Sequence, residues 1–319
     1  MKKTLLVLIA FMVLLSGCKV QEKEYNNRKP IEQGKNIINK EDKKQSENKT
    51  GLKSNQMGKI MILMYHRFTD KETDDWTRSF ENFKKDLQVL YAKGYRPISL
   101  RDYIDGKIDI PAGFTPIVFT FDDGTAGQFN LVEKDGVLVA NPKSAVGIME
   151  EFNKVHPDFG LKGTFFINYT SFFSGKGSSE QKLKYLVDKG FEIGNHTMSH
   201  INLKKAISPE VIEQEIGEHV KKTGEIIPDY VVDELALPLG ISSKKYPQYV
   251  VEGEYKGIKY KNRAIMLVGS NPALSPFDKN RKLLQLPRIR ARGKVPVEND
   301  MYYWMNYFDK NPGQRFVAN

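Results

Sequence analysis

Short apolar runs alternate with amphipathic stretches along most of the chain. Buried strands are predicted where apolar residues are continuous, over Lys59–His66, Pro116–Phe121, Lys162–Asn168, Phe191–Gly194, Tyr230–Leu237, Ala264–Val268 and Leu283–Ile289. Helices are predicted where apolar residues recur every three or four positions, over Ser79–Lys93, Lys143–Val155, Ser178–Lys189, Ser208–Lys222 and Glu298–Asp309. Strands that alternate with helices indicate parallel βαβ units in an open sheet or a barrel.

The first residues of the chain follow a different pattern. Met1-Lys2-Lys3 is basic, and the apolar run Leu5–Leu15 is too short to span a bilayer, so residues 1–17 are predicted to be a secretory signal. The signal ends in Leu15-Ser16-Gly17-Cys18, which resembles a bacterial lipobox with cleavage before Cys18 and lipid on its thiol. The alternative is a different cleavage site with a free Cys18 nearby.

Residues 18–57 are predicted to be a flexible tether. They are rich in Lys, Glu, Asn and Gln, so they bury too little apolar surface to offset the entropy of ordering. The tether and the signal carry most of the formal charge of +10, and no basic cluster with interleaved aromatic residues remains. Nucleic-acid binding therefore loses its support. The single cysteine excludes an internal disulfide framework, and residues 58–319 have the length of one domain.

Chemically active side chains follow three of the predicted strands. Asp122 and Asp123 come directly after Pro116–Phe121, His196 and His200 follow Phe191–Gly194, and His66 ends the first strand. Because active sites in parallel barrels gather at the carboxyl ends of the strands, we expect these residues to meet on one rim.

The types of these residues point to metal-assisted hydrolysis. The i, i+4 spacing of His196 and His200 predicts that both imidazoles lie on one side of a helical turn. Two histidines and one aspartate suit a divalent ion such as Zn²⁺, and the second aspartate remains free as a base. Taken singly, Asp-Asp-Gly is commonly a turn, and a His-x₃-His pair is often exposed at the surface without binding a metal. Their joint placement after predicted strands favours a functional site.

These motifs resemble those of a known family. Thr120-Phe-Asp-Asp-Gly124 and His196-Thr-Met-Ser-His200 are similar to the first two signature motifs of the polysaccharide deacetylases, the NodB-homology or carbohydrate esterase 4 group. Gly163-Thr-Phe-Phe-Ile-Asn168 resembles the strand between them, and Met64-Tyr-His-Arg67 resembles the start of lipoprotein-type members. The resemblance implies an α/β fold, a distorted (β/α) barrel of about seven parallel strands. It also implies Asp122 as the general base and Asp123, His196 and His200 as metal ligands.

The later motifs depart from the family pattern. Ala236 stands where the family has an arginine that orients the base, although the following Pro-Leu-Gly turn would still present the Leu239 N–H to an oxyanion. No histidine follows His219, so the late general acid of the family is absent. We expect Arg288 to replace the missing arginine and His66 to act as the acid or as a substrate ligand. An ordinary ion pair for Arg288 and a structural role for His66 are the alternatives.

The resemblance implies a hydrolase of carbon–nitrogen bonds other than peptide bonds, and the chain is expected to be a monomer. It would use a divalent metal, with zinc the ion expected, to remove N-acetyl groups from peptidoglycan, a chitin-like glycan or poly-N-acetylglucosamine. The lipid on Cys18 would hold it at the extracellular face of the bacterial cell membrane. The rival interpretations are a glycan-binding lipoprotein with a weakened site, which the two missing residues motivate, and a hydrolase of another amide or ester. His219, within a polar helix, is expected to be solvated, and the aromatic residues from Tyr302 to Tyr307 are expected to pack rather than bind sugar.

Overall fold

The computed structural model describes residues 50–292 and 299–319. The predicted signal, the lipobox with Cys18 and most of the tether therefore lie outside the described residues, and remain predictions. In the part of the chain that the structure describes, no helix is long and apolar enough to cross a membrane.

Residues 50–57, expected to belong to the tether, are part of the folded domain. The N–H of Asn55 donates to the carbonyl of Val317 and the N–H of Val317 donates back, both at 2.9 Å. The Thr50 hydroxyl donates to the Gly113 carbonyl at 2.6 Å. The boundary at residue 57 is therefore corrected, because the pairing uses backbone groups of a polar segment that hydrophobic patterning does not reveal.

The domain alternates strands and helices, as the pattern of apolar residues predicts. The strands are β1 (Met61–Tyr65), β2 (Arg67–Thr69), β3 (Thr77–Ser79), β4 (Tyr95–Pro97), β5 (Thr115–Asp123), β6 (Leu131–Lys134), β7 (Val137–Ala140), β8 (Thr164–Ile167), β9 (Glu192–Asn195), β10 (Glu234–Ala236), β11 (Glu252–Tyr255), β12 (Ile258–Lys261), β13 (Ala264–Met266) and β14 (Ile289–Arg290). The α-helices are α1 (Phe80–Ala92), α2 (Leu100–Asp105), α3 (Ala145–Val155), α4 (Ser179–Asp188), α5 (Pro209–Ile226), α6 (Pro247–Val251) and α7 (Met301–Lys310).

Seven parallel strands form the central sheet, in the order β13-β10-β9-β8-β5-β1-β14, and β4 adds to β5. The segment before β14 brings the two ends of this sheet together. Leu286 bridges to Met266 of β13, and three residues later Ile289 pairs with Leu63 of β1. The predicted distorted (β/α) barrel is confirmed.

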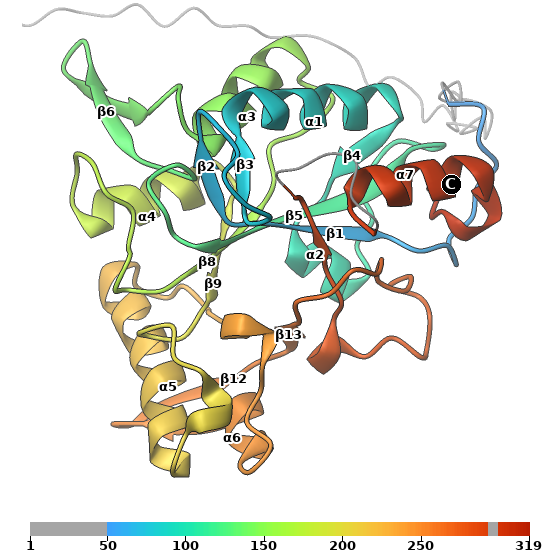
Figure 1. Ribbon diagram of the computed structural model, residues 1–319. Coiled ribbons are helices and arrows are strands. Elements are labelled where there is room, and N and C mark those ends of the chain that lie inside the picture. Colours follow the sequence, from blue (N-terminus) through green and yellow to red (C-terminus); the bar gives the residue numbers. More distant parts are fainter. Residues whose placement is uncertain (1–49, 293–298) are drawn as a thin grey trace, which may run out of the picture. The chain divides into compact units, whose positions relative to one another are not determined.

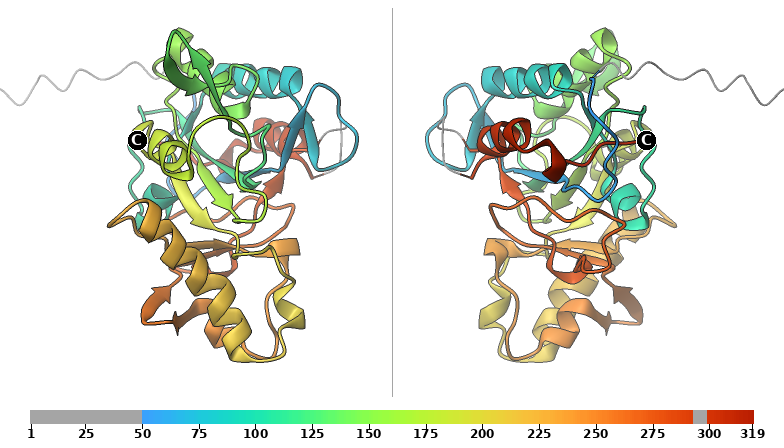
Figure 2. Two further views of the ribbon diagram at one scale, coloured as in Figure 1. Left: turned by 90° about the vertical axis from the view of Figure 1, so that its left-hand side faces the viewer. Right: turned by 90° about the vertical axis from the view of Figure 1, so that its right-hand side faces the viewer.

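Helices cover the strands on the outside. Figure 1 shows α1 and α3 side by side along one side of the sheet, where their apolar faces bury residues such as Phe83 and Met149. Figure 2 shows the long helix α5 with the β11–β12 hairpin near it, and α5 contacts both strands. Because side chains and helices cover both faces, β1 is buried at every position and β5 at all but its last.

Two predicted strands are shorter than expected. The segment Leu283–Gln285 is a 3₁₀ turn, after which Leu286 bridges to Met266 and pairing with β1 begins at Ile289. Pro287 lies between them and has no N–H to donate to a neighbouring strand, which accounts for the interruption. Of the predicted strand over Tyr230–Leu237, only Glu234–Ala236 forms a strand. The predicted range is bounded by Asp229, which has φ 65°, and by Pro238.

His219 is buried, so the expectation that it is solvated is wrong. It is 0% exposed on α5, and its Nε2–H donates to the Ile167 carbonyl at the end of β8 at 2.9 Å. The periodicity of α5 shows only part of its buried face, because a histidine counts as polar in the pattern. Of the aromatic residues of α7, Tyr302, Trp304 and Tyr307 pack against the core as expected, whereas Tyr303 is 40% exposed. The Trp304 indole N–H donates to the Ser270 carbonyl at 2.6 Å.

Candidate active site

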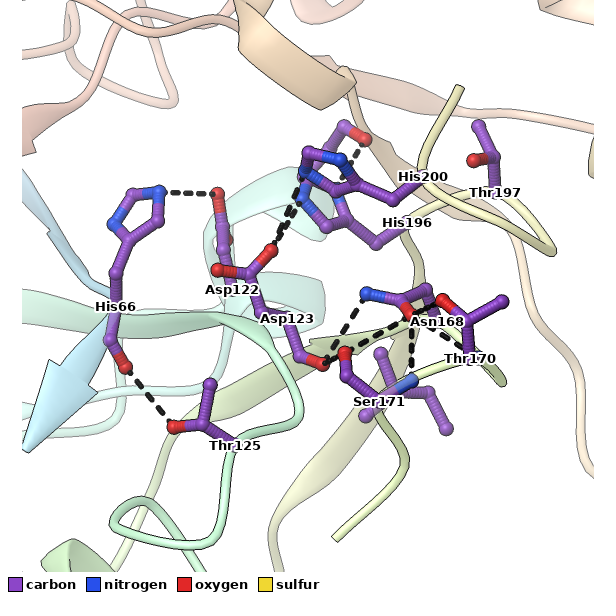
Figure 3. A network of polar contacts seen from close by, with 12 residues as sticks. His66, Asp122, Asp123, Thr125, Asn168, Thr170, Ser171, His196, Thr197 and His200 are labelled. Atoms are coloured by element: carbon purple, nitrogen blue, oxygen red, sulfur yellow. Dashed lines mark hydrogen bonds and ion pairs between the residues drawn. The ribbon is translucent and has the colours of Figure 1, made fainter.

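The two adjacent aspartates occupy the last two positions of β5. Asp122 points into the barrel and is 1% exposed, whereas Asp123 is partly exposed at the rim. Asp123 adopts a left-handed conformation with φ 83°, which turns the chain and separates the two side chains. Its carbonyl accepts from Asn168 Nδ2 at 3.3 Å and Ser171 Oγ at 2.9 Å, as Figure 3 shows. These bonds hold a strained residue at the point where the strand ends.

Asp123, His196 and His200 form a compact group of potential metal ligands. Nε2 of each imidazole lies 3.4 Å from Asp123 Oδ1, and the three ligand atoms are within 4.8 Å of one another. His196 Nδ1 lies 2.8 Å from the Ala236 carbonyl, which can only accept, so Nδ1 carries the proton. The lone pair of Nε2 therefore faces Asp123, as metal ligation requires. The donor set fits a divalent ion of the zinc type, with further positions open.

The two histidines do not lie on a helical turn, which corrects that expectation. Residues 196–200 form an irregular loop after β9, with Thr197 and His200 both at φ 59°. Glu215 of α5 fixes this loop by accepting from the Ser199 N–H at 2.8 Å and the Ser199 hydroxyl at 2.6 Å. The two imidazoles thus come together because Glu215 fixes the loop that carries them. The i, i+4 spacing alone does not predict this contact between Glu215 and Ser199.

Arg288 lies directly on Asp122. Its two terminal nitrogens donate to Oδ1 and Oδ2 of Asp122, each at 2.7 Å, and its Nε donates to the Leu267 carbonyl at 3.0 Å. Arg288 is 0% exposed. Burial alone would raise the pKa of Asp122, but the charge and the hydrogen bonds of Arg288 lower it to about 2. The carboxylate is therefore ionised at neutral pH and oriented by a bidentate pair.

His66 lies on the other side of Asp122. Its Nε2 is 3.8 Å from Asp122 Oδ2, and its carbonyl accepts from the Thr125 hydroxyl at 3.4 Å (Figure 3). The same carbonyl accepts from Gln128 Nε2 at 2.6 Å. Burial lowers the pKa of His66 to about 4, although the charges of Asp122 and Asp123 oppose this. The imidazole is then neutral at pH 7, which favours a substrate ligand over an acid that is protonated before the reaction.

A cavity of about 540 Å³ opens over these residues. Its wall includes Leu239, which is 58% exposed and has φ 60° in the Pro238–Gly240 turn. It also includes Trp76 and Arg290, which the sequence reasoning did not assign to the site. Trp76 precedes β3 in a polar stretch without a motif, so only its spatial contact with His66, at 4.6 Å between ring centroids, shows its place.

Comparison with known proteins supports the resemblance that the motifs indicate. Residues 110–258 match the polysaccharide deacetylase family model. The matched segment, residues 110–258, is identified as a polysaccharide deacetylase domain. The matched segment contains Asp122, Asp123, His196, His200 and Leu239, whereas His66 and Arg288 lie outside it. A Bacillus subtilis (strain 168) relative named for the same deacetylase family is 20% identical over 217 residues, which are 67% of this chain and 70% of the relative.

Solved structures of deacetylases share the fold. The Streptococcus pyogenes deacetylase PplD, solved in complex with acetate, superposes with a TM-score of 0.58 at 18% identity, covering 78% of this chain and 98% of its own. A polysaccharide deacetylase from Bacillus cereus superposes with a TM-score of 0.58 at 20% identity, covering 78% of this chain and 69% of its own. The domain therefore shares the fold of these two deacetylases.

Proposed function

We propose that the protein is a metal-dependent hydrolase that removes N-acetyl groups from an extracellular or cell-wall glycan. The observation that carries this proposal is that the proposed base lies beside the group of potential metal ligands. Asp122, fixed by Arg288, adjoins Asp123, His196 and His200 at the floor of one cavity. The family match, the S. pyogenes deacetylase with acetate and the donor chemistry support the proposal.

The residues of this chain divide the work of amide hydrolysis. Asp123, His196 and His200 would hold the divalent ion, with zinc proposed. The ion supplies a Lewis acid that polarises the acetyl carbonyl and lowers the pKa of water. Asp122 takes the proton of the attacking water, while Arg288 keeps the carboxylate oriented. The Leu239 N–H donates to the oxyanion. The neutral imidazole of His66 binds the substrate, and the proton held by Asp122 leaves with the amine.

The proposed location rests on the sequence of the N-terminal region. A lipid on Cys18 would hold the domain at the outer face of the bacterial cell membrane, where N-acetylated polymers of the envelope are within reach. The chain is proposed to act there as a monomer. Labelling with a radioactive fatty acid in a bacterial host checks the anchor, and a Cys18→Ala variant that keeps the label contradicts it.

Acetate release tests the activity. The full chain is incubated with N-acetylglucosamine oligomers and with peptidoglycan, with and without a chelator. We expect release that the chelator abolishes and that Asp122→Asn reduces by about 1,000-fold, because the base is lost while the fold remains. Release that neither treatment affects contradicts the proposal. Glycan binding without release favours the binding lipoprotein, and turnover of other acyl compounds alone favours a different amide or ester hydrolase.

A further inference from the structure

Arg290 reaches the cavity from β14, two residues after the arginine that holds the base. Its guanidinium carbon lies 4.9 Å from the centroid of the Trp76 ring. The Trp76 ring also contacts the ring of His66, which in turn faces Asp122. Arg290 is thus held at the cavity wall one aromatic ring away from the catalytic residues, and half-buried rather than extended into solvent.

The stacking leaves the hydrogen-bonding capacity of Arg290 unused. A guanidinium that lies over an aromatic ring uses its flat face, while its N–H groups point outward in the plane. Among residues 50–292 and 299–319, the side chain of Arg290 makes no hydrogen bond or ion pair. The charge of Asp75 acts on it from a distance, but Asp75 is paired with Arg292 at 3.9 Å. A partly desolvated guanidinium without a partner favours an anion in its plane.

The other charged side chains of this cavity have partners. Arg67 is paired with Asp74 at 2.6 Å, Asp122 with Arg288 at 2.7 Å, and Asp123 contacts the two histidines. Arg290 is therefore the cation of the cavity wall that is available to a ligand, within the described part of the chain.

We propose that Arg290, placed by Trp76, binds a carboxylate or phosphate group of the substrate, so that the enzyme prefers an acidic N-acetylated glycan to a neutral one. The inference rests on the proposed function and adds the charge of its substrate. The shared chemistry is a planar or tetrahedral oxyanion that a guanidinium binds with two N–H groups. The anion can be on the reacting sugar or on its neighbour, since the cavity extends from His66 to Arg290.

The test compares three matched oligosaccharides in acetate release by the full chain. They share one acetylated backbone and carry a free carboxylate, its methyl ester or a phosphate. We expect kcat/KM for the better of the two anionic substrates to exceed that for the ester by about 10-fold, mainly through KM, since one charge-assisted contact is gained. The better of the two anionic substrates shows whether Arg290 binds a carboxylate or a phosphate group.

Three variants distinguish the effect of Arg290 on substrate preference from the effect of a neighbouring arginine. Arg290→Gln should reduce the preference to less than about 2-fold while activity on the ester is retained, and Arg290→Lys should keep part of it. Arg67→Gln is the control, since it removes an arginine of the same cavity whose charge Asp74 already offsets. Equal turnover of all three substrates by the wild type, or an unchanged preference in Arg290→Gln, overturns the inference.

The proposed function and this inference fail in different ways. Acetate release from the neutral ester in the absence of a preference leaves the deacetylase intact and refutes only the role of Arg290. If no substrate releases acetate, calorimetric binding of the same three compounds to the wild type and to Arg290→Gln still decides the inference. Equal affinities for the charged and the neutral compounds would then refute it.

Discussion

Arg288 and Asp122 form a fully buried bidentate pair, although 166 residues separate them in the chain. Asp122 is the next-to-last residue of β5, while Arg288 lies just before β14, in the segment that brings the two ends of the sheet together. Where the family resemblance expects an arginine, the chain has Ala236, whose carbonyl instead binds His196 Nδ1. The guanidinium that orients the base thus comes from the segment before β14 instead of from the end of β10.

Removing Arg288 should damage both activity and stability. Arg288→Ala leaves a buried carboxylate without its partner, so we expect a loss of about 3–5 kcal/mol in the free energy of unfolding. Activity should fall by at least about 100-fold, because the base loses its orientation. Urea unfolding and acetate release measure these two effects. A variant with wild-type kcat/KM would remove Arg288 from the mechanism.

The pH profile gives a second measure of the same pair. Arg288 is a main cause of the lowered pKa of Asp122, about 2, which burial alone would raise. Asp122 is then protonated at a higher pH in Arg288→Lys, where a point charge replaces the bidentate pair. We expect the acid limb of kcat/KM to move to higher pH in this variant, whereas Arg292→Lys, with its partly exposed arginine, should keep the wild-type profile.

His66 should act in its neutral form. Because burial lowers its pKa to about 4, the imidazole is neutral through the range in which the enzyme would work. We therefore expect His66→Ala to lower activity by about 10-fold, mostly in KM, and to keep the alkaline limb of the pH profile. Loss of the alkaline limb in this variant would instead identify His66 as the general acid.

Metal binding should stabilise the domain through Asp123, His196 and His200. Added Zn²⁺ at about 100 times its dissociation constant contributes about 2.7 kcal/mol, so the Tm should rise on addition and fall with a chelator. His200→Ala should abolish this shift. Asp122→Asn is the control, because it removes the proposed base and leaves the ligands, and it should retain the shift. A shift that persists in His200→Ala would place the ion elsewhere.

His219 should make the fold sensitive to acid. Burial lowers the pKa of His219 to about 3, while the unfolded imidazole has its ordinary value of 6.5. The unfolded state therefore binds more protons below pH 6.5, and stability is lost as the pH falls towards 3. At pH 5 the loss from this group is about 2 kcal/mol. His219→Gln, which can still donate to Ile167, should reduce the slope of unfolding free energy between pH 7 and 5, and an identical slope would contradict this.

The sequence by itself determined the alternation of strands and helices and the placement of the reactive side chains at the ends of β1, β5 and β9. Both follow from local information, since periodicity reports which faces are buried and polar residues after an apolar run mark strand ends. The two motifs also identified Asp122, Asp123, His196 and His200 as one group, and the structure brings these four residues together.

The tertiary structure decided the contacts between distant segments. The burial of His219, the fastening of the histidine loop by Glu215, and the place of Trp76 and Arg290 at the cavity all depend on how separate strands and helices pack. Nothing local marks such residues, because their neighbours in space lie tens to hundreds of positions away in the chain. Arg288 is the intermediate case, since the sequence offered it as a candidate and only closure of the barrel placed its guanidinium on Asp122.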